Sequence, residues 1–221
     1  MTESVPGQAQ GVFISFEGVE AVGKSTAMRV AGEILTTLGV DWISTREPGG
    51  TPVAEQLRAI VLGTHEEAVS DTTELLLMFA ARAQSIANVI RPALAMGQWV
   101  LCDRFTDATL AYQGYGRGFE LDVIYRLAAL VHDDLWPDKT LLLHAEPAVV
   151  AERLASRPDG KDRIEQQSSA FFESVRRGYE TLAAASPDRY VRLDTSGSVT
   201  TLEANLRDLF SRWLSSNKKH Q

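Results

Sequence analysis

The sequence has little of what would direct a protein to an oxidising compartment or to a membrane. Cys102 is the only cysteine among 221 residues, so the chain cannot form an internal disulfide bond. No apolar run reaches the roughly 18 residues that a membrane-spanning helix requires. Residues 1–10 contain neither the basic segment nor the apolar segment of a signal peptide. We therefore expect a cytoplasmic protein with no membrane association.

Positive charge is also scarce. Lysine and arginine number 22 against 29 aspartates and glutamates, which gives a net charge of −7. General nucleic-acid binders usually carry the opposite balance, so no nucleic-acid partner is expected. The apolar content of 44% is sufficient for a full core, and a single domain over residues 11–215 is the simplest organisation. Residues 1–10 and 216–221 are polar, and they are expected to form flexible tails.

What the sequence does contain is a glycine-rich phosphate-binding motif, G-x-x-x-x-G-K-S. An apolar run over residues 12–17 precedes it, and apolar residues at helical spacing follow it. Glycines let backbone N–H groups surround phosphate oxygens, and the start of a helix favours negative charge. Lys24 can reach the β- and γ-phosphates, and the Ser25 hydroxyl can bind Mg²⁺. The motif and the next residue comprise Gly18, Val19, Glu20, Ala21, Val22, Gly23, Lys24, Ser25 and Thr26.

Short apolar segments with strand character alternate with segments of helical periodicity. The expected strands are 12–17, 40–45, 99–102, 140–144 and 190–193, and the expected helices are 27–38, 53–61, 71–90, 121–130, 147–157, 168–184 and 202–214. This alternation predicts an α/β fold with three layers, α/β/α, around a five-stranded parallel sheet. Ligands in such folds bind beyond the carboxyl ends of the strands. The glycine-rich motif should therefore meet residues 46–50, 103–104 and 153–163 at one edge.

Other patterns concern the local structure. Asp71 and Glu74 have the spacing of a helix N-cap and its N3 carboxylate, which predicts that the helix after 64–70 begins with a capping box. Pro92 interrupts a helical pattern and is expected to kink or restart the helix. Residues 105–118 are rich in polar residues and glycine.

Charged residues near the expected binding edge allow two interpretations each. Asp103 ends an apolar strand, so it fits either a helix cap or a carboxylate that binds Mg²⁺. Arg82 interrupts an apolar helix, which suits either a snorkelling arginine or a residue that hydrogen-bonds a nucleobase. Arg153, Arg157 and Arg163 surround a Pro-Asp-Gly break. They fit either a solvated helix face or a mobile lid that delivers arginines to a phosphoryl group.

Taken in order, the motifs resemble those of bacterial thymidylate kinases. The ordered set extends from about residue 12 to residue 165, and apart from the P-loop no single motif is specific. The matching segments are F-E-G at 16–18, the P-loop, T-R-E-P-G-G-T at 45–51, F-A-A-R-A-Q at 79–84, D-R-F at 103–105, Y-Q-G at 112–114, G-R-G at 116–118 and D-R-I-E at 162–165.

The resemblance implies a fold, an activity and an assembly. The fold is a P-loop NTPase of the nucleoside monophosphate kinase type, with a short lid at about 153–165. The implied activity is ATP-dependent phosphorylation of dTMP to dTDP by in-line transfer, with Mg²⁺ as cofactor. The family is homodimeric, so a homodimer is implied, and the helical face that carries Leu75–Leu77 is a candidate for its interface.

The resemblance also implies roles for individual residues. Lys24, Arg104 and Arg157 correspond to catalytic positions, with Arg157 as the lid arginine. Ser25 and Asp103 correspond to the positions that support Mg²⁺, and the P-loop residues 18–26 bind ATP.

For the acceptor, the resemblance implies that Arg82 hydrogen-bonds the thymine edge and that Arg104 holds the phosphate. Glu20 would face the 3′-hydroxyl of the sugar, and a tyrosine under C2′ would exclude a ribose hydroxyl. The full set implied for substrate binding is Glu20, Arg46, Pro48, Phe79, Arg82, Arg104, Thr109, Tyr112 and Gln113.

The sequence departs from the family pattern at a few positions. Ala21 and Val22 stand where a Gly-Ala pair is common. The aromatic residue that stacks on the base usually lies four residues before the arginine, where this chain has Met78, with Phe79 one position later. Either residue could cover the thymine. The lid segment 158–161 is one residue longer than usual.

Two other functions remain as alternatives. A kinase of another deoxynucleoside monophosphate would share the fold and the phosphate chemistry. A regulatory P-loop switch belongs to a different class, and a guanine-specific N-K-x-D segment would favour it, but the sequence contains none. A phosphate-transfer assay across the monophosphates would separate these alternatives.

Overall fold

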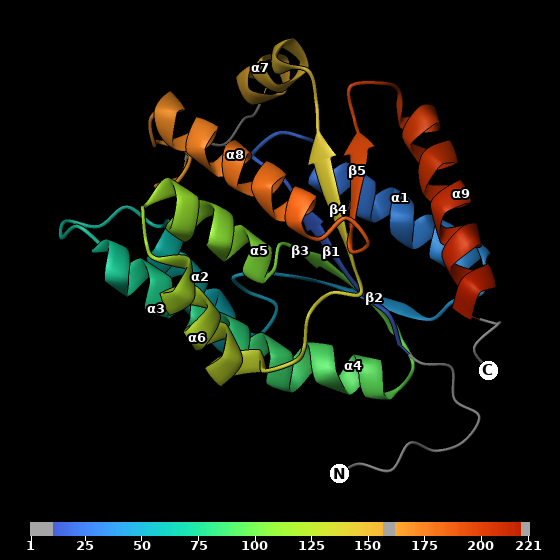
Figure 1. The fold of residues 1–221 in the computed structure, drawn as a ribbon, viewed down its shortest axis with the longest axis horizontal. Helices are drawn as coiled ribbons and strands as arrows, with labels where there is room; N and C mark the ends of the chain where they lie inside the picture. The colour runs from blue at the N-terminus through green and yellow to red at the C-terminus, as the bar shows by residue number, and fades with distance from the viewer. Residues whose placement is uncertain (1–10, 157–161, 218–221) are drawn as a thin grey trace.

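The computed structural model describes residues 11–156 and 162–217. At its centre lies a five-stranded sheet with the strand order β2-β3-β1-β4-β5 (Figure 1). Each neighbouring pair is parallel, which confirms the α/β fold expected from the sequence. The strands are β1 (Phe13–Glu17), β2 (Trp42–Arg46), β3 (Trp99–Asp103), β4 (Lys139–His144) and β5 (Tyr190–Asp194).

Helices cover both faces of this sheet. Figure 1 shows α1 and α9 together on one side, and α3, α6 and α8 on the other. The α-helices are α1 (Lys24–Thr37), α2 (Pro52–Leu62), α3 (Asp71–Ser85), α4 (Arg91–Ala95), α5 (Thr106–Thr109), α6 (Leu121–His132), α7 (Pro147–Ala155), α8 (Ser169–Ala185) and α9 (Val199–Asn217), and the π-helical segments are η1 (Ile86–Ile90) and η2 (Leu110–Gly116).

The central strand β1 is buried along its length because both of its faces are covered. Ile14 and Phe16 pack in a cluster with residues of α1 and α9. Phe13 lies in a separate cluster with Ile86 and Ile90 of η1. Alternate side chains of the strand thus enter opposite layers, as the two-residue repeat of a β-strand requires.

The strand register places several expected site segments at one edge of the sheet. Phe16 of β1 and Arg46 of β2 both lie opposite Asp103, the last residue of β3. The P-loop after β1 and the segment after β2 therefore begin at the same level as Asp103 and Arg104. This confirms the meeting of these segments predicted from the sequence.

The expected capping box at Asp71 and Glu74 is wrong. The N-cap of α3 is Ser70, whose hydroxyl accepts a hydrogen bond of 3.2 Å from the backbone N–H of Thr73. Glu74 does not cap the helix, because its side chain is buried among donors from distant segments. A side chain that compensates buried cations cannot also reach back to the helix start.

The polar, glycine-rich stretch 105–118 is largely helical and buried. It forms α5 and η2, in which Tyr112 and Gln113 are buried. The Pro92 expectation is partly confirmed: α3 continues through η1, and the proline lies in the first turn of α4. Among the described residues, no helix combines the length and apolar character needed to cross a membrane.

Helix α8 and segment η2 interlock through two glycines. A Cβ atom at Gly178 of α8 would lie 2.7 Å from Cδ2 of Tyr115, and one at Gly116 of η2 would lie 2.6 Å from Cε2 of Phe171. Both distances are shorter than a carbon–carbon contact allows. The absence of these two side chains lets η2 pack directly on α8, which fixes the position of Tyr112 and Gln113.

We expect Gly178→Ala to destabilise the protein by about 1–3 kcal/mol, because overpacking against Tyr115 outweighs the gain in helix propensity of about 1 kcal/mol. Chemical denaturation measures the change in the free energy of unfolding. Ala184→Gly on the exposed face of α8 is the matched control, and it should cost only the propensity difference of about 1 kcal/mol. A more stable Gly178→Ala protein would contradict the close approach.

Candidate active site

A cavity of about 320 Å³ lies at the carboxyl edge of the sheet. Its wall combines the P-loop with side chains that follow β2 and β3, and with residues from α3, η2 and the segment 162–165. These elements are far apart in the sequence, and the strand register brings them together. Of the residues expected to form the site, those that line the cavity are Glu20, Ala21, Gly23, Lys24, Ser25, Thr26, Pro48, Asp103, Arg104, Tyr112 and Gln113.

The P-loop keeps a strained path at the position where its sequence is unusual. Ala21 has a φ of 58°, in the left-handed region that normally favours glycine. Val22 is buried in the core beneath the loop, with 2% of its surface exposed. Gly18 has a φ of 131°, and a Cβ atom there would lie 2.5 Å from the carbonyl oxygen of Leu143. Ala21 therefore adopts a left-handed conformation at a position where the family pattern commonly has glycine.

Lys24 begins α1 and folds back over the loop. Its Nζ donates hydrogen bonds to the carbonyl oxygens of Gly18 at 3.1 Å and Val19 at 2.9 Å. Burial, together with the nearby charge of Arg104, lowers the pKa of Lys24 to about 8. Both of the acceptors that Lys24 has among the described residues are neutral, so its ammonium group remains available to an anion in the cavity.

Arg104 is held by four acceptors. Its Nη1 donates to the carbonyl oxygen of Gly18 at 2.9 Å and to the hydroxyl of Tyr179 at 3.1 Å. Its Nη2 donates to Glu20 Oε1 and to the hydroxyl of Tyr112, each at 3.0 Å. The backbone of Arg104 has a φ of 72°, so the residue adopts an uncommon conformation to reach these partners.

Behind Arg104 lies the buried carboxyl group of Glu17, a residue of the F-E-G segment to which the sequence reasoning gave no role. Glu17 accepts hydrogen bonds from the backbone N–H of Phe105 at 2.7 Å and from the hydroxyl of Tyr179 at 2.8 Å. Burial and the charge of Asp107 raise the pKa of Glu17 to about 8. Tyr179 thereby connects Glu17 to Arg104, and a tyrosine in a helix gives no sequence signal for such a role.

Arg82 is fully buried, so the snorkelling interpretation is wrong. Its side chain is 1% exposed and pairs with Glu47, with 2.6 Å between Nε and Oε2. Nη2 donates to the hydroxyl of Thr109 at 3.0 Å, and the guanidinium lies 4.9 Å from the ring centre of Phe79. Nη1 is buried and has no hydrogen-bond partner among the described residues. Glu47, a residue of the T-R-E-P-G-G-T segment to which the sequence reasoning gave no role, lines the cavity, whereas Arg82 itself does not.

Met78, and not Phe79, lines the cavity. Phe79 is 3% exposed and packs on Arg82 instead. Met78, four residues before Arg82, therefore faces the cavity, and this is the position at which the family pattern has its aromatic residue. That aromatic character is lost in this chain.

The residues expected to support a metal line both the cavity and an adjoining hollow. Ser25 and Asp103 both line the cavity, and Oδ1 of Asp103 is buried without a partner in the described part of the chain. Arg46 lies beside them on the adjoining hollow and pairs with Glu55 at 2.8 Å. Residues 11–156 and 162–217 contain no cluster of three or more acidic, histidine or cysteine side chains suited to a metal.

Of the three arginines near the expected lid, Arg153 and Arg163 do not form a solvated helix face. Arg153 of α7 donates to the carbonyl oxygens of Ala21 at 3.3 Å and Thr195 at 2.7 Å, so it lies on the P-loop. Arg163 forms an ion pair with the buried Glu74. Arg157, expected to be the lid arginine, lies outside the described residues.

Comparison with known proteins gives the family. The sequence model of the thymidylate kinase family matches residues 16–206. The chain belongs to the thymidylate kinase family. The thymidylate kinase of Pseudomonas entomophila is 50% identical over 87% of this chain and 91% of the relative. That of Teredinibacter turnerae is 45% identical over 92% of this chain and 99% of the relative.

The thymidylate kinase fold is shared as well. The crystal structure of thymidylate kinase from Ehrlichia chaffeensis superposes with a TM-score of 0.74 at 27% identity, and it covers 91% of this chain and 99% of the neighbour. Thymidylate kinases are phosphotransferases, so the chain is an enzyme. The P-loop NTPase fold and the kinase family inferred from the motifs are thus confirmed.

We expect ATP binding to be coupled to proton uptake at Lys24. Its pKa of about 8 means that near pH 8 half of the molecules carry a neutral amine, whereas phosphates beside it favour the charged form. The apparent Kd for ATP should therefore rise about tenfold between pH 7 and pH 9. Calorimetry in two buffers of different ionisation enthalpy measures the uptake, which should approach about half a proton at pH 8.

Lys24→Met provides the control for this measurement, because it removes the titrating group. Proton uptake of the same size in the Lys24→Met protein would assign the effect to another group.

Proposed function

We propose that this enzyme transfers the γ-phosphoryl group of ATP to dTMP, producing dTDP, within one kinase domain over residues 11–215. The observation that carries the proposal is the shared cavity, which is lined both by P-loop residues and by Glu47, the partner of the buried Arg82. A phosphate-binding loop and a buried, partly unpaired guanidinium suit a substrate with a phosphate and a polar base edge. Residues 153–165 would serve as the lid.

The base would be read by groups that are buried and unpaired. Thymine presents O4 as an acceptor and N3–H as a donor. Among the described residues, Nη1 of Arg82 is a donor that has no partner, and Oε1 of Gln113 is an acceptor that has no partner. Arg82 would donate to O4 and Gln113 would accept from N3–H, while Met78 would cover the ring and Phe79 would hold the arginine from behind. The apolar wall and a few convergent polar groups are typical of a specific ligand site.

The acceptor phosphate would bind Arg104. In the structure that arginine pairs with Glu20 at 3.0 Å, and Tyr112 also donates to Glu20, at 2.6 Å. A phosphate group competes with the carboxylate for the same guanidinium, which would release Glu20 toward the sugar hydroxyl. Lys24 and Arg157 would neutralise charge on the transferred group. Catalysis would rest on positioning and charge, because the acceptor is already an oxyanion.

Ser25 and Asp103 fit a Mg²⁺ ion. A hydroxyl and a buried, unpaired carboxylate oxygen on one cavity wall are the oxygen ligands that this ion prefers, alongside phosphate oxygens and water. When bound, Mg²⁺ supplies charge neutralisation to the phosphates. Arg46 lies beside these groups, where it would extend the positive surface.

Neither alternative function gains support. The relatives reported above are thymidylate kinases, and none is a regulatory switch. An enzyme specific for another deoxynucleoside monophosphate would need a group other than the Arg82 donor facing the base edge. The cytoplasmic location and the absence of nucleic-acid or membrane partners stay predictions.

We expect the enzyme to phosphorylate dTMP far better than dCMP, with dUMP between them. Cytosine presents an amino donor to the free Arg82 donor, whereas uracil loses only a methyl contact worth about 1 kcal/mol. Arg82→Met alone would leave Glu47 as an uncompensated buried carboxylate, which costs about 3–5 kcal/mol. The variant is therefore combined with Glu47→Gln.

In the double variant, kcat/KM for dTMP and for dUMP should fall together by roughly 100-fold, while ATP binding is retained. Glu47→Gln alone is the matched control, and it should keep the thymine preference. An unchanged ratio of dTMP to dCMP in the double variant would assign base reading to Thr109 or Gln113.

We also propose a homodimer that uses the exposed apolar side chains of α2, α3 and α6. Leu76 of α3 is 52% exposed, whereas its neighbour Leu75 is buried. Val53 and Ile60 of α2 and Leu130 of α6 are also exposed, and α3 contacts both of these helices. Such a group of apolar side chains on adjoining helices is suited to a second copy of the chain.

Leu76→Asp should therefore convert the dimer to a monomer, because a charge in the centre of the interface loses its solvation. Analytical ultracentrifugation gives the mass in solution. Met96→Asp, at an exposed residue that follows α4, is the control and should leave the mass unchanged. A Leu76→Asp protein of wild-type mass would contradict this interface.

A further inference from the structure

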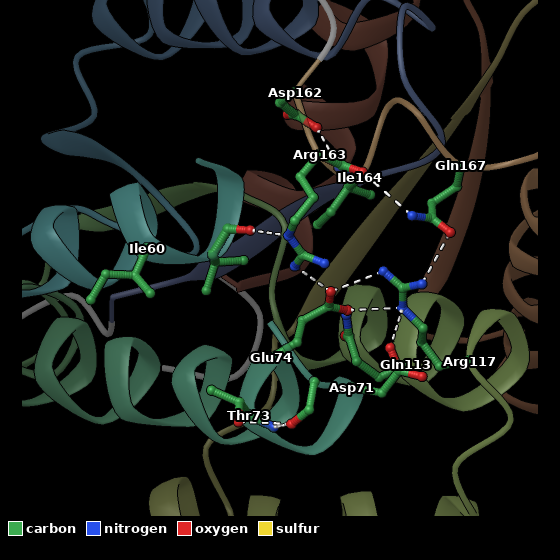
Figure 2. A network of polar contacts seen from close by, with 12 residues as sticks. Ile60, Asp71, Thr73, Glu74, Gln113, Arg117, Asp162, Arg163, Ile164 and Gln167 are labelled. Carbon is green, nitrogen blue, oxygen red and sulfur yellow. Dashed lines mark hydrogen bonds and ion pairs between the residues drawn. The ribbon is translucent and has the colours of Figure 1, made fainter. Parts of the chain in front are cut away.

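Glu74 is a buried carboxylate that gathers donors from two distant segments (Figure 2). Its side chain is 1% exposed. It accepts from Gln113 Nε2 at 2.8 Å, from Arg117 Nη2 at 2.9 Å and Nε at 3.2 Å, and from Arg163 Nη2. Burial by itself would raise the pKa of Glu74, but the bonds from Arg117, Gln113 and Arg163 hold that pKa below its ordinary value. Glu74 is therefore a carboxylate at neutral pH.

The partners of Glu74 belong to two parts of the proposed active site. Gln113 lies in η2 and lines the cavity. Arg163 lies at the carboxyl end of the proposed lid, where its Nε donates to the carbonyl oxygen of Val61 at 2.9 Å. Arg117 joins the two parts, because its Nη1 donates to Oε1 of Gln167 at 3.0 Å. Glu74 is the common acceptor of this network.

The charge of Glu74 decides which way the Gln113 amide points. A carboxylate only accepts hydrogen bonds, so it must face the NH₂ group of the amide. The amide oxygen is then directed away from Glu74, and Oε1 is buried without a partner in the part of the chain that the structure describes. The same side chain lines the cavity, so this oxygen is the group available to a base.

We propose that Glu74 is a positioning residue of the kinase: its carboxylate orients the Gln113 amide for the acceptor base and links that amide to the lid end through Arg163. The proposal rests on the role proposed above for Gln113. An amide at position 74 has one acceptor oxygen, which cannot serve Gln113 and both arginines. The Gln113 amide would then rotate and present NH₂ to the base, where N3 of cytosine accepts and N3–H of thymine does not.

The chain offers a matched control in Asp71. This residue lies one turn earlier on the same helix and is 55% exposed, with its Oδ1 at 3.4 Å from Arg117 Nε. Asp71→Asn removes a carboxylate from the same arginine without touching Gln113 or Arg163. Any effect that comes only from the charge of Arg117 should appear in both variants.

The experiment compares kcat/KM for dTMP and dCMP, and KM for ATP, in wild type, Glu74→Gln, Asp71→Asn, Gln113→Leu and the double variant of positions 74 and 113. Glu74→Gln should lower the ratio of dTMP to dCMP by at least about tenfold, through a higher KM for dTMP. Asp71→Asn should keep the wild-type ratio. The double variant should be no less selective than Gln113→Leu alone, because both substitutions remove the same interaction, the contact of the Gln113 amide with the base.

The outcomes separate this proposal from the functions on which it depends. Wild type that does not phosphorylate dTMP would overturn the proposed function. A Gln113→Leu protein of normal selectivity would overturn the role of Gln113, and the role of Glu74 with it. Normal selectivity in Glu74→Gln, beside lost selectivity in Gln113→Leu, would leave Glu74 a purely structural residue and overturn the proposal alone.

Glu74→Asp keeps the test open if Glu74→Gln does not fold. It retains the negative charge beside the arginines, but its shorter side chain withdraws from Gln113. Reduced selectivity with normal thermal stability supports the positioning role, and wild-type selectivity overturns it. Hydrogen–deuterium exchange of residues 162–167 gives the second readout. Binding of dTMP should slow exchange of these residues in wild type, and it should slow their exchange less in the Glu74→Asp protein.

Discussion

A parallel sheet that is covered by helices on both faces can present polar side chains only where its strands end. In this enzyme β1, β2 and β3 end at the same level, because Phe16 and Arg46 both lie opposite Asp103. The phosphate loop, the Arg46 segment and the Asp103–Arg104 pair follow from that register. A shift of one residue in β3 would turn Asp103 toward a helix layer and separate it from Ser25.

Several arginines near this edge have a carboxylate partner, since an unpaired buried charge costs several kcal/mol. Arg82 pairs with Glu47, Arg104 with Glu20, and Arg117 and Arg163 with Glu74. This explains how an acidic chain concentrates the cations that a nucleotide requires. Arginine is suited to these positions because its planar fork can serve a carboxylate and a ligand at once.

The sequence predicts the strands, the P-loop and their common edge because these depend on local patterns and on the rules of parallel sheets. It does not predict the partners of Glu74, which lie 39, 43 and 89 residues away. The local spacing of Asp71 and Glu74 imitates a capping box, and burial overrides that pattern. The buried π-helical η2 was also missed, because its residues do not follow the ordinary helical period. Although Glu17 lies in the F-E-G segment, the sequence gives no role to Glu17 or Tyr179, because their roles follow from contacts with Arg104 and Phe105.

Lys24 illustrates how the loop and its reactive cation depend on each other. The ammonium group is held by the carbonyl oxygens of Gly18 and Val19. An incoming triphosphate must compete with these two acceptors, so binding is an exchange of ligands around one nitrogen. The net affinity gained from Lys24 is the difference between two sets of contacts, which is smaller than its full attraction for phosphate. Before a nucleotide binds, the lysine already has two hydrogen-bond partners, so the loop does not hold a bare cation.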